Sequence, residues 1–167
     1  MTAEQSIRSI TLFGSSLSAP TSQNYKDAYA TAKLVAHSGR TVINGGGPGT
    51  MLAATTGAKE AGGKAIAVYY TPKYATSFEG KAAENFADQV YEEANYLMRT
   101  KKLLELGDLY VIFNGGTGTI SEFGMAWGSL GSTLGITSRS SFLAKDGSIS
   151  LTHLKKTCSY LRRLCVS

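Results

Sequence analysis

The stretch from Leu109 to Trp127 constrains the fold of this chain more than any other part of the sequence. It opens with Leu109–Phe113, an apolar run typical of a strand that is buried on both faces of a parallel sheet. Asn114–Gly118 then supplies three glycines in five residues, and the apolar spacing becomes helical from Thr119. The orphan N–H groups and the dipole of such a helix point into the preceding loop, so this arrangement predicts an anion site.

The predicted helix carries one acidic residue close to that anion site. Its apolar residues form a single stripe, Ile120, Phe123, Trp127 and Leu130. Glu122 lies about one turn inside the helix, where its charge opposes the binding of a phosphate. We interpret it as a residue with a chemical role. The alternative is an ordinary first-turn acid that favours the helix dipole.

Two further predicted strands also end in loops rich in small residues. Ile7–Phe13 precedes Gly14-Ser15-Ser16, and Thr41–Ile43 precedes a glycine loop that ends at Met51. The remaining predicted elements are the helices Asn24–Ser38, Thr50–Ala61 and Tyr96–Leu106 and the strands Lys64–Tyr70 and Gln89–Glu92. This alternation predicts a single α/β domain with a three-layer, doubly wound parallel sheet of the Rossmann-like type. Ligands of such sheets bind outside the carboxyl ends of the strands, where the three loops converge.

Size and composition favour one globular domain. The chain has 167 residues, and 43% of them are hydrophobic. No apolar stretch reaches the roughly 18–20 residues of a membrane span, and the N-terminus lacks the apolar core of a signal peptide. We therefore expect a cytoplasmic protein without a membrane partner. Two cysteines and two isolated histidines, Cys158, Cys165, His37 and His153, form no metal-ligand pattern, so we expect neither a metal nor a cofactor.

The positive net charge is confined to the C-terminal thirty residues. Residues 138–167 contain six of the 17 Lys and Arg residues and one of the 12 Asp and Glu residues. Residues 1–137 therefore contain 11 residues of each sign. The sequence thus predicts a nucleotide-binding domain over 1–137 and a basic, atypical segment over 138–167. Leu151–Cys165 is compatible with a basic amphipathic helix. A neutral domain does not predict a nucleic-acid partner.

The glycine loops match neither of two common nucleotide-binding patterns. No G-x-x-x-x-G-K-[ST] sequence is present, and no G-x-G-x-x-G sequence follows the first strand. A Walker-type nucleotide hydrolase and a dinucleotide oxidoreductase are therefore disfavoured, and the residues alone predict a small ligand that carries a phosphate.

The segment from Asn114 to Glu122 resembles the P-G-G-x-G-T-x-x-E motif of the Lonely Guy (LOG) family. These enzymes are cytokinin riboside 5′-monophosphate phosphoribohydrolases, long labelled lysine decarboxylases. Arg99 occupies the arginine position of the family's M-H-x-R-K motif, and the loops at Gly14–Ser16 and Gly45–Met51 also match. The resemblance covers roughly residues 7 to 128. The chain departs from the family at the motif proline, here Asn114, at the Met-His pair, here Tyr96-Leu97, and at the following lysine, here Thr100.

The resemblance implies a role for each matching residue. The loop that binds the 5′-phosphate would comprise Gly115, Gly116, Thr117, Gly118 and Thr119. Further ligand contacts are expected at Gly14, Ser15, Gly46, Gly47 and Thr50, although Ser15 and Thr50 are equally compatible with simple helix caps. Arg99 and Glu122 would flank the ribose as the catalytic pair, because a carboxylate stabilises the positive charge that develops when an N-glycosidic bond breaks.

The resemblance leaves two functions open. One is hydrolysis of a nucleoside 5′-monophosphate, of the AMP or cytokinin riboside type, to free base and ribose 5-phosphate. The other is a carrier without turnover, like the related molybdenum-cofactor carriers, which the altered proline and the missing Met-His pair favour. Lysine decarboxylation is disfavoured, because the chain is small and no lysine stands out as a Schiff-base candidate. The family also implies a homodimer or larger homo-oligomer, with Phe123, Trp127 and Leu130 at the contact.

Overall fold

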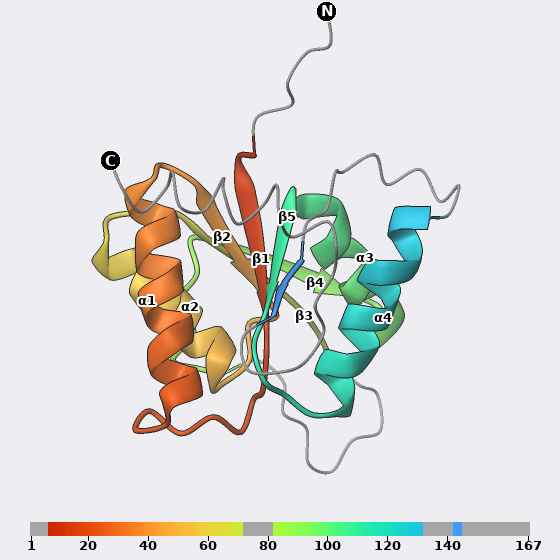
Figure 1. Cartoon of the computed structure of the whole chain (residues 1–167), viewed down its shortest axis with the longest axis horizontal. Helices are drawn as coiled ribbons and strands as arrows, with labels where there is room; N and C mark the ends of the chain where they lie inside the picture. Colours follow the sequence, from red (N-terminus) through yellow and green to blue (C-terminus); the bar gives the residue numbers. More distant parts are fainter. Residues whose placement is uncertain (1–6, 72–81, 132–141, 145–167) are drawn as a thin grey trace, which may run out of the picture.

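The computed structural model describes residues 7–71, 82–131 and 142–144 (Figure 1). Six parallel strands form one sheet in the order β4-β3-β2-β1-β5-β6. Their bounds are Ser9–Phe13 for β1, Thr41–Asn44 for β2, Ala65–Tyr70 for β3, Gln89–Glu93 for β4, Leu109–Ile112 for β5 and Phe142–Ala144 for β6. The structure confirms the predicted doubly wound α/β fold.

Helices cover both faces of the sheet and complete the three layers. They are α1 (Gln23–His37), α2 (Thr50–Glu60), α3 (Tyr96–Leu106) and α4 (Thr117–Gly131). Figure 1 shows α1 and α2 together on one face and α3 and α4 on the other. Ser22 and Asn95 cap α1 and α3, and each side chain accepts a hydrogen bond from a first-turn amide, as favoured N-cap residues do.

The hydrophobic core divides into two clusters, one beneath each pair of helices. On the α1 and α2 face, small helix residues such as Ala32 and Ala58 pack against strand residues that include Leu12 and Val111. On the α3 and α4 face, the core includes Leu103 and Leu104 of α3, Phe13, Val68 and Tyr110 of the strands, and Ala126 of α4. The strands β1, β2, β3 and β5 are therefore buried on both faces over most of their length, as their continuous apolar runs predict.

The strand order reverses between β1 and β5. The chain moves outward from β1 through β2 and β3 to β4, and it then returns to pair β5 with the other side of β1. Backbone hydrogen bonds join the loops that follow these strands. Ser15 N donates to Asn114 O at 3.2 Å, and Thr50 N donates to Ser15 O at 2.9 Å. The carboxyl ends of β1, β2 and β5 therefore meet at this switch point.

The last strand lies beyond the boundary predicted at residue 137. Phe142–Ala144 pairs in parallel with β5, although the sequence around it is rich in Ser, Thr and Gly. The amphipathic helix predicted over Leu151–Cys165 lies outside the described residues. None of the described helices combines the length and the apolar character that crossing a membrane requires.

Candidate functional site

An open cavity of about 410 Å³ lies over the carboxyl ends of the strands at the switch point. Its lining comes from the loops after β1, β2 and β5 and from the ends of β3, α2, α3 and α4. The lining residues are Leu12, Phe13, Gly14, Ser15, Ser16, Leu17, Gly45, Met51, Tyr69, Tyr70, Tyr96, Arg99, Gly116, Thr117, Gly118, Thr119 and Glu122. The structure thus brings both predicted catalytic residues and six of the ten predicted ligand-binding residues to one cavity.

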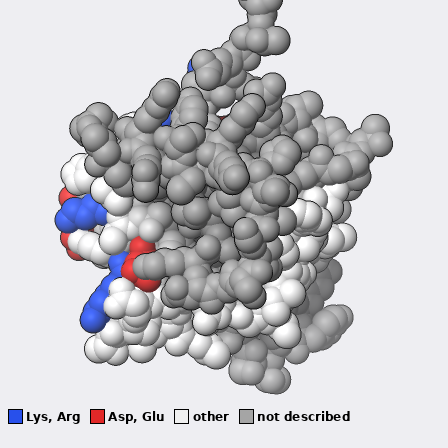
Figure 2. All heavy atoms as spheres, in the orientation of Figure 1, with Lys and Arg blue, Asp and Glu red and all other residues white. Residues whose placement is uncertain are grey.

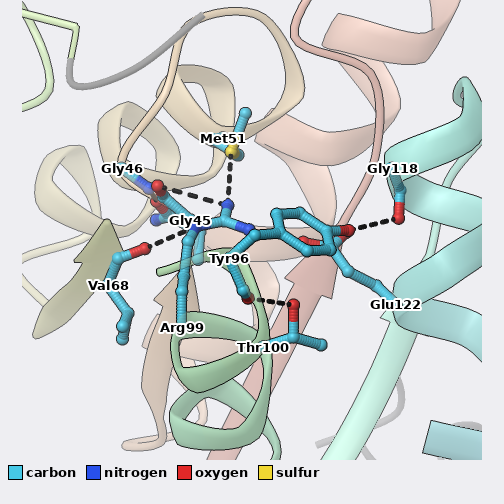
Figure 3. A network of polar contacts seen from close by, with 10 residues as sticks. Gly45, Gly46, Met51, Val68, Tyr96, Arg99, Thr100, Gly118 and Glu122 are labelled. Atoms are coloured by element: carbon cyan, nitrogen blue, oxygen red, sulfur yellow. Dashed lines mark hydrogen bonds and ion pairs between the residues drawn. The ribbon is translucent and has the colours of Figure 1, made fainter. Parts of the chain in front are cut away.

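Arg99 extends from α3 across the ends of two strands and is only 8% exposed. Its Nε donates to Val68 O of β3 at 3.0 Å, and its Nη2 donates to Gly45 O at 3.4 Å. A Cβ at Gly45 would lie 1.7 Å from Nη2, so the arginine reaches this position only because residue 45 is glycine. These contacts, drawn in Figure 3, fix the guanidinium plane.

Glu122 of α4 forms an ion pair with Arg99 inside the cavity wall. Arg99 Nη1 lies 2.8 Å from Glu122 Oε1, and Glu122 is 6% exposed. Burial raises the pKa of the Glu122 carboxyl, and the charge and hydrogen bond of Arg99 oppose that rise. Among the described residues, none donates a hydrogen bond to the second oxygen, Oε2. Oε1 is therefore held in place while Oε2 can meet a ligand.

The N-terminus of α4 presents unused amides to the same cavity. The first intrahelical bond runs from Ile120 N to Gly116 O at 3.1 Å. The N–H groups of Thr117, Gly118 and Thr119 therefore have no acceptor in the helix, and the rest of the described chain offers them none. Three adjacent donors at the positive end of a helix dipole form an anion cradle, and we use that name for them below.

The glycines of the loop after β5 serve two different purposes. A Cβ at Gly115 would lie 2.1 Å from Thr119 Oγ1, so packing within the loop requires glycine there. A Cβ at Gly116 would meet none of the described atoms within 4 Å, and one at Gly118 would meet only Tyr96 Oη, at 3.7 Å. Because neither has the positive φ that favours glycine, local structure does not require these two glycines. Without a Cβ, both positions leave the backbone open to close approach by a ligand.

Ser15 can contribute to the site through its hydroxyl group. Its backbone N–H already donates to Asn114 O, and its Oγ accepts from Leu17 N at 3.1 Å. The hydroxyl proton remains able to point into the cavity that Ser15 lines. Gly14, directly before it, also lines the cavity, and a Cβ there would lie 2.6 Å from Thr50 Cγ2.

Four predicted ligand contacts do not line the cavity. Thr50 is fully buried, and its Oγ1 accepts from Asn24 Nδ2 at 3.2 Å, so it holds the loops together. Gly46 N donates to Asn44 Oδ1, and Gly47 O accepts from Asn85 Nδ2, so these backbone groups are engaged within the protein. The fourth is Gly115, which packs against Thr119 as described above.

The cavity also contains residues to which the sequence analysis assigned no ligand contact. Three tyrosines, Tyr69, Tyr70 and Tyr96, line it together with Met51 and Gly45. Tyr69 and Tyr70 end the predicted strand Lys64–Tyr70, so the sequence could have placed them at the carboxyl edge of the sheet, beside the site. Met51 Sδ lies 3.7 Å from Arg99 Nη2, a contact that no sequence pattern reveals. Within the described ranges, no group of three or more potential metal ligands occurs.

On the described part of the face drawn in Figure 2, most of the visible Lys and Arg surface lies beside Asp and Glu at one margin, and most of the remaining described surface is uncharged.

Comparison with known proteins identifies one matching family and several similar folds. A model of the SLOG cluster4 family matches residues 7–157. An uncharacterized protein from Archaeoglobus fulgidus is 32% identical over 104 residues, which are 62% of this chain and 64% of that protein. The match therefore spans less than two thirds of the archaeal protein's length.

Two solved structures share the fold. The molybdenum cofactor binding protein from Rippkaea orientalis has a TM-score of 0.63 and 21% identity, covering 96% of this chain and 86% of that one. The Moco carrier protein from Chlamydomonas reinhardtii has a TM-score of 0.61 and 20% identity, covering 95% and 86%. At such identities the likeness establishes the fold alone.

Proposed function

This chain belongs to the SLOG cluster4 family, and from that membership and its cavity we propose that it is a phosphoribohydrolase of the LOG type. It would cleave the N-glycosidic bond of a nucleoside 5′-monophosphate to give free base and ribose 5-phosphate. The observation that carries the proposal is the buried Arg99–Glu122 pair, which lies in one cavity with the anion cradle. A reaction at the ribose of a nucleotide requires a carboxylate near a phosphate site, and Glu122 and the anion cradle line the same cavity.

The anion cradle supports binding of the 5′-phosphate. The amides of Thr117, Gly118 and Thr119 can donate to phosphate oxygens, and the hydroxyls of Thr117 and Ser15 line the same cavity. The open space above Gly116 and Gly118 lets the phosphate approach the backbone. With the phosphate held there, the ribose would lie over Arg99 and Glu122.

The carboxylate of Glu122 supports the chemical step. Breaking the bond between C1′ and the base nitrogen leaves positive charge on C1′ and O4′, which a nearby carboxylate stabilises. Water adds its oxygen to C1′, and a proton passes to the departing base. Glu122 Oε2 can orient that water or accept its proton, while Arg99 fixes Oε1 and keeps the ionised form accessible despite burial.

The aromatic side of the cavity suits the base. Tyr69 and Tyr70 extend the lining along the sheet edge, away from the cradle and toward β3. Aromatic rings offer a sequence-tolerant stacking surface to any nucleobase. We propose AMP, or a related adenine nucleotide, as the first substrate to test, with no nucleic acid or membrane as partner.

A carrier without turnover is the second candidate. The likeness to the molybdenum cofactor binding protein covers 96% of this chain, and Asn114 and Tyr96 replace the proline and methionine of the LOG motifs. A carrier would use the cradle and the cavity but would gain nothing from an anionic Glu122 beside an anionic ligand.

Product analysis separates the two candidates. The purified chain is incubated with AMP, GMP, CMP and UMP, and free base and ribose 5-phosphate are measured by chromatography. The hydrolase releases the two products in equal amounts from at least one substrate. Tight nucleotide binding with no release from any of the four would favour the carrier and contradict the hydrolase.

A further inference from the structure

Tyr96, the first residue of α3, touches both halves of the site. Its hydroxyl donates to Gly118 O in the first turn of α4 at 2.9 Å. Its ring centroid lies 5.9 Å from Cζ of Arg99, and the ring meets Tyr70 edge-on at 6.0 Å. Figure 3 shows the ring lying between the arginine and the α4 terminus, with Glu122 beside it.

We propose that Tyr96 is a positioning residue that couples the anion cradle to the Arg99–Glu122 pair. Its hydroxyl sets the donor strength and orientation of the cradle, and its ring holds the guanidinium of Arg99 against Glu122. The inference rests on the proposed function, because it assigns a role in binding and turnover at the same site. Tyr96 itself need not touch the ligand.

The hydroxyl acts through a single peptide group. Gly118 O and the N–H of Thr119 belong to the same peptide, and they point in opposite directions along the helix axis. Donation by Tyr96 to the oxygen polarises the peptide and strengthens its N–H as a donor. That N–H is one of the three donors of the anion cradle. The Tyr96 hydroxyl therefore supports phosphate binding from the far side of the peptide.

The same carbonyl lies next to the catalytic carboxylate along the helix. In an α-helix the carbonyl of residue i accepts from the amide of residue i+4, so Gly118 O is the partner of the Glu122 amide. The Tyr96 contact thus braces the turn that carries Glu122. Burial and the negative charge of Glu122 raise the pKa of Tyr96 further above neutral pH, so the hydroxyl is protonated and able to donate.

The ring has a separate effect on Arg99. A guanidinium over an aromatic face is stabilised by the ring and is shielded from water. Loss of the ring opens space beside the ion pair and allows Arg99 to move away from Glu122. Tyr96→Phe should therefore weaken the cradle and the brace on the first turn of α4, whereas Tyr96→Leu should in addition disturb the ion pair.

The test compares Tyr96→Phe and Tyr96→Leu with Tyr29→Phe, which removes a tyrosine hydroxyl bonded to Glu60 outside the cavity. Ribose 5-phosphate binding is measured by calorimetry, and kcat and KM are measured with AMP. Tyr96→Phe should weaken ribose 5-phosphate binding by about two- to tenfold, the range for one hydrogen bond, and should lower kcat less than Tyr96→Leu does. Tyr96→Leu should weaken binding similarly and should also lower kcat by about tenfold or more.

The inference is overturned if Tyr96→Phe binds ribose 5-phosphate as tightly as Tyr29→Phe does. It is also overturned if a folded Tyr96→Leu variant keeps the wild-type kcat. Tyr96→Phe retains the ring and tests the cradle even if Tyr96→Leu does not fold. The calorimetric measurement requires no turnover, so a wild-type protein that binds ribose 5-phosphate but releases no base would contradict the hydrolase without contradicting the role of the hydroxyl.

Discussion

Glu122 carries its charge in surroundings that disfavour it. Burial raises the pKa of its carboxyl, and the guanidinium of Arg99 compensates only in part. Removing one member of a buried pair typically costs about 3–5 kcal/mol, because the other charge is left unpaired. A buried carboxylate with a perturbed pKa beside a cavity is common in active sites, where its charge acts on the substrate.

The raised pKa of Glu122 predicts how stability depends on pH. A carboxyl whose pKa is higher in the folded state stabilises the fold below its unfolded value, near 4.5, and that contribution is lost as pH rises through the folded value. Glu122→Gln has no such titration. The Tm of the variant minus that of the wild type should therefore increase from pH 4 to pH 7, as measured by calorimetric melting. A difference that decreases over this range would mean that Arg99 dominates and lowers the pKa.

The helix α4 places polar side chains on the side that lines the site and large apolar side chains on the side that faces outward. Thr119, Glu122 and Ala126 are buried, whereas Ile120 and Trp127 are 66% and 47% exposed. The helix begins at Thr117, two residues before the predicted start, so the loop glycine Gly118 lies inside its first turn. Its N-terminus is therefore built into the cavity wall.

The loop glycines of α4 predict opposite results for two matched substitutions. Gly118→Ala finds space and favours the helix, so the free energy of unfolding should stay equal or rise by up to about 1 kcal/mol. Its methyl group should weaken ribose 5-phosphate binding by about tenfold, or about 1.4 kcal/mol. Gly115→Ala clashes with Thr119 Oγ1 and should lower the free energy of unfolding by about 1–3 kcal/mol.

Urea unfolding and calorimetry measure the two quantities. If Gly118→Ala bound ribose 5-phosphate as tightly as the wild type does, close approach of a ligand would not explain why residue 118 is glycine.

Much of the fold follows from local patterns. Apolar runs such as Leu109–Phe113 and the glycines that end each helix place the elements, and parallel pairing brings their loops to one edge. Two features do not follow from local pattern. The apolar stripe of α4 identifies a helix but not the side that faces the sheet, because the buried side there carries Glu122. The strand β6 has too short an apolar run to be recognised, since its pairing with β5 is a long-range contact.

The site is predicted less completely than the fold. Arg99 and Glu122 reach one cavity because the ends of α3 and α4 converge on the switch point, which strand alternation already implies. Gly46, Gly47 and Thr50 share the glycine-loop pattern, yet they lie outside the cavity lining. Side-chain hydrogen bonds that involve Asn24, Asn44 and Asn85 fix the positions of these loops, and the partners of Asn24 and Asn85 are distant from them in sequence.

For the whole molecule, the outward face of α4 supports the proposed homodimer. Ile120 and Trp127 are exposed there, Phe123 is partly buried, and Leu97 and Met98 of the neighbouring α3 are 59% and 45% exposed. Exposed large apolar side chains on neighbouring helices commonly mark a contact with another protein. We propose that two copies of the chain pair through it about a two-fold axis.

Sedimentation velocity tests the proposed dimer. The wild type should sediment as a dimer at micromolar concentration, and Trp127→Glu should shift the population toward a 17.7 kDa monomer. Leu34→Glu is the control, because Leu34 is 55% exposed on α1, on the opposite face of the sheet. A wild type that remains monomeric, or equal effects from the two substitutions, would contradict this assignment.

The proposed reaction depends on the charge of Glu122 acting on a breaking glycosidic bond. The most direct measurement compares base release from AMP by the wild type, Glu122→Gln and Glu105→Gln, an exposed α3 carboxylate paired with Lys101. We predict that Glu122→Gln lowers kcat by about 10²-fold or more while AMP binding is retained or tightened, and that Glu105→Gln has no effect. A Glu122→Gln variant that releases adenine at the wild-type rate would contradict the account.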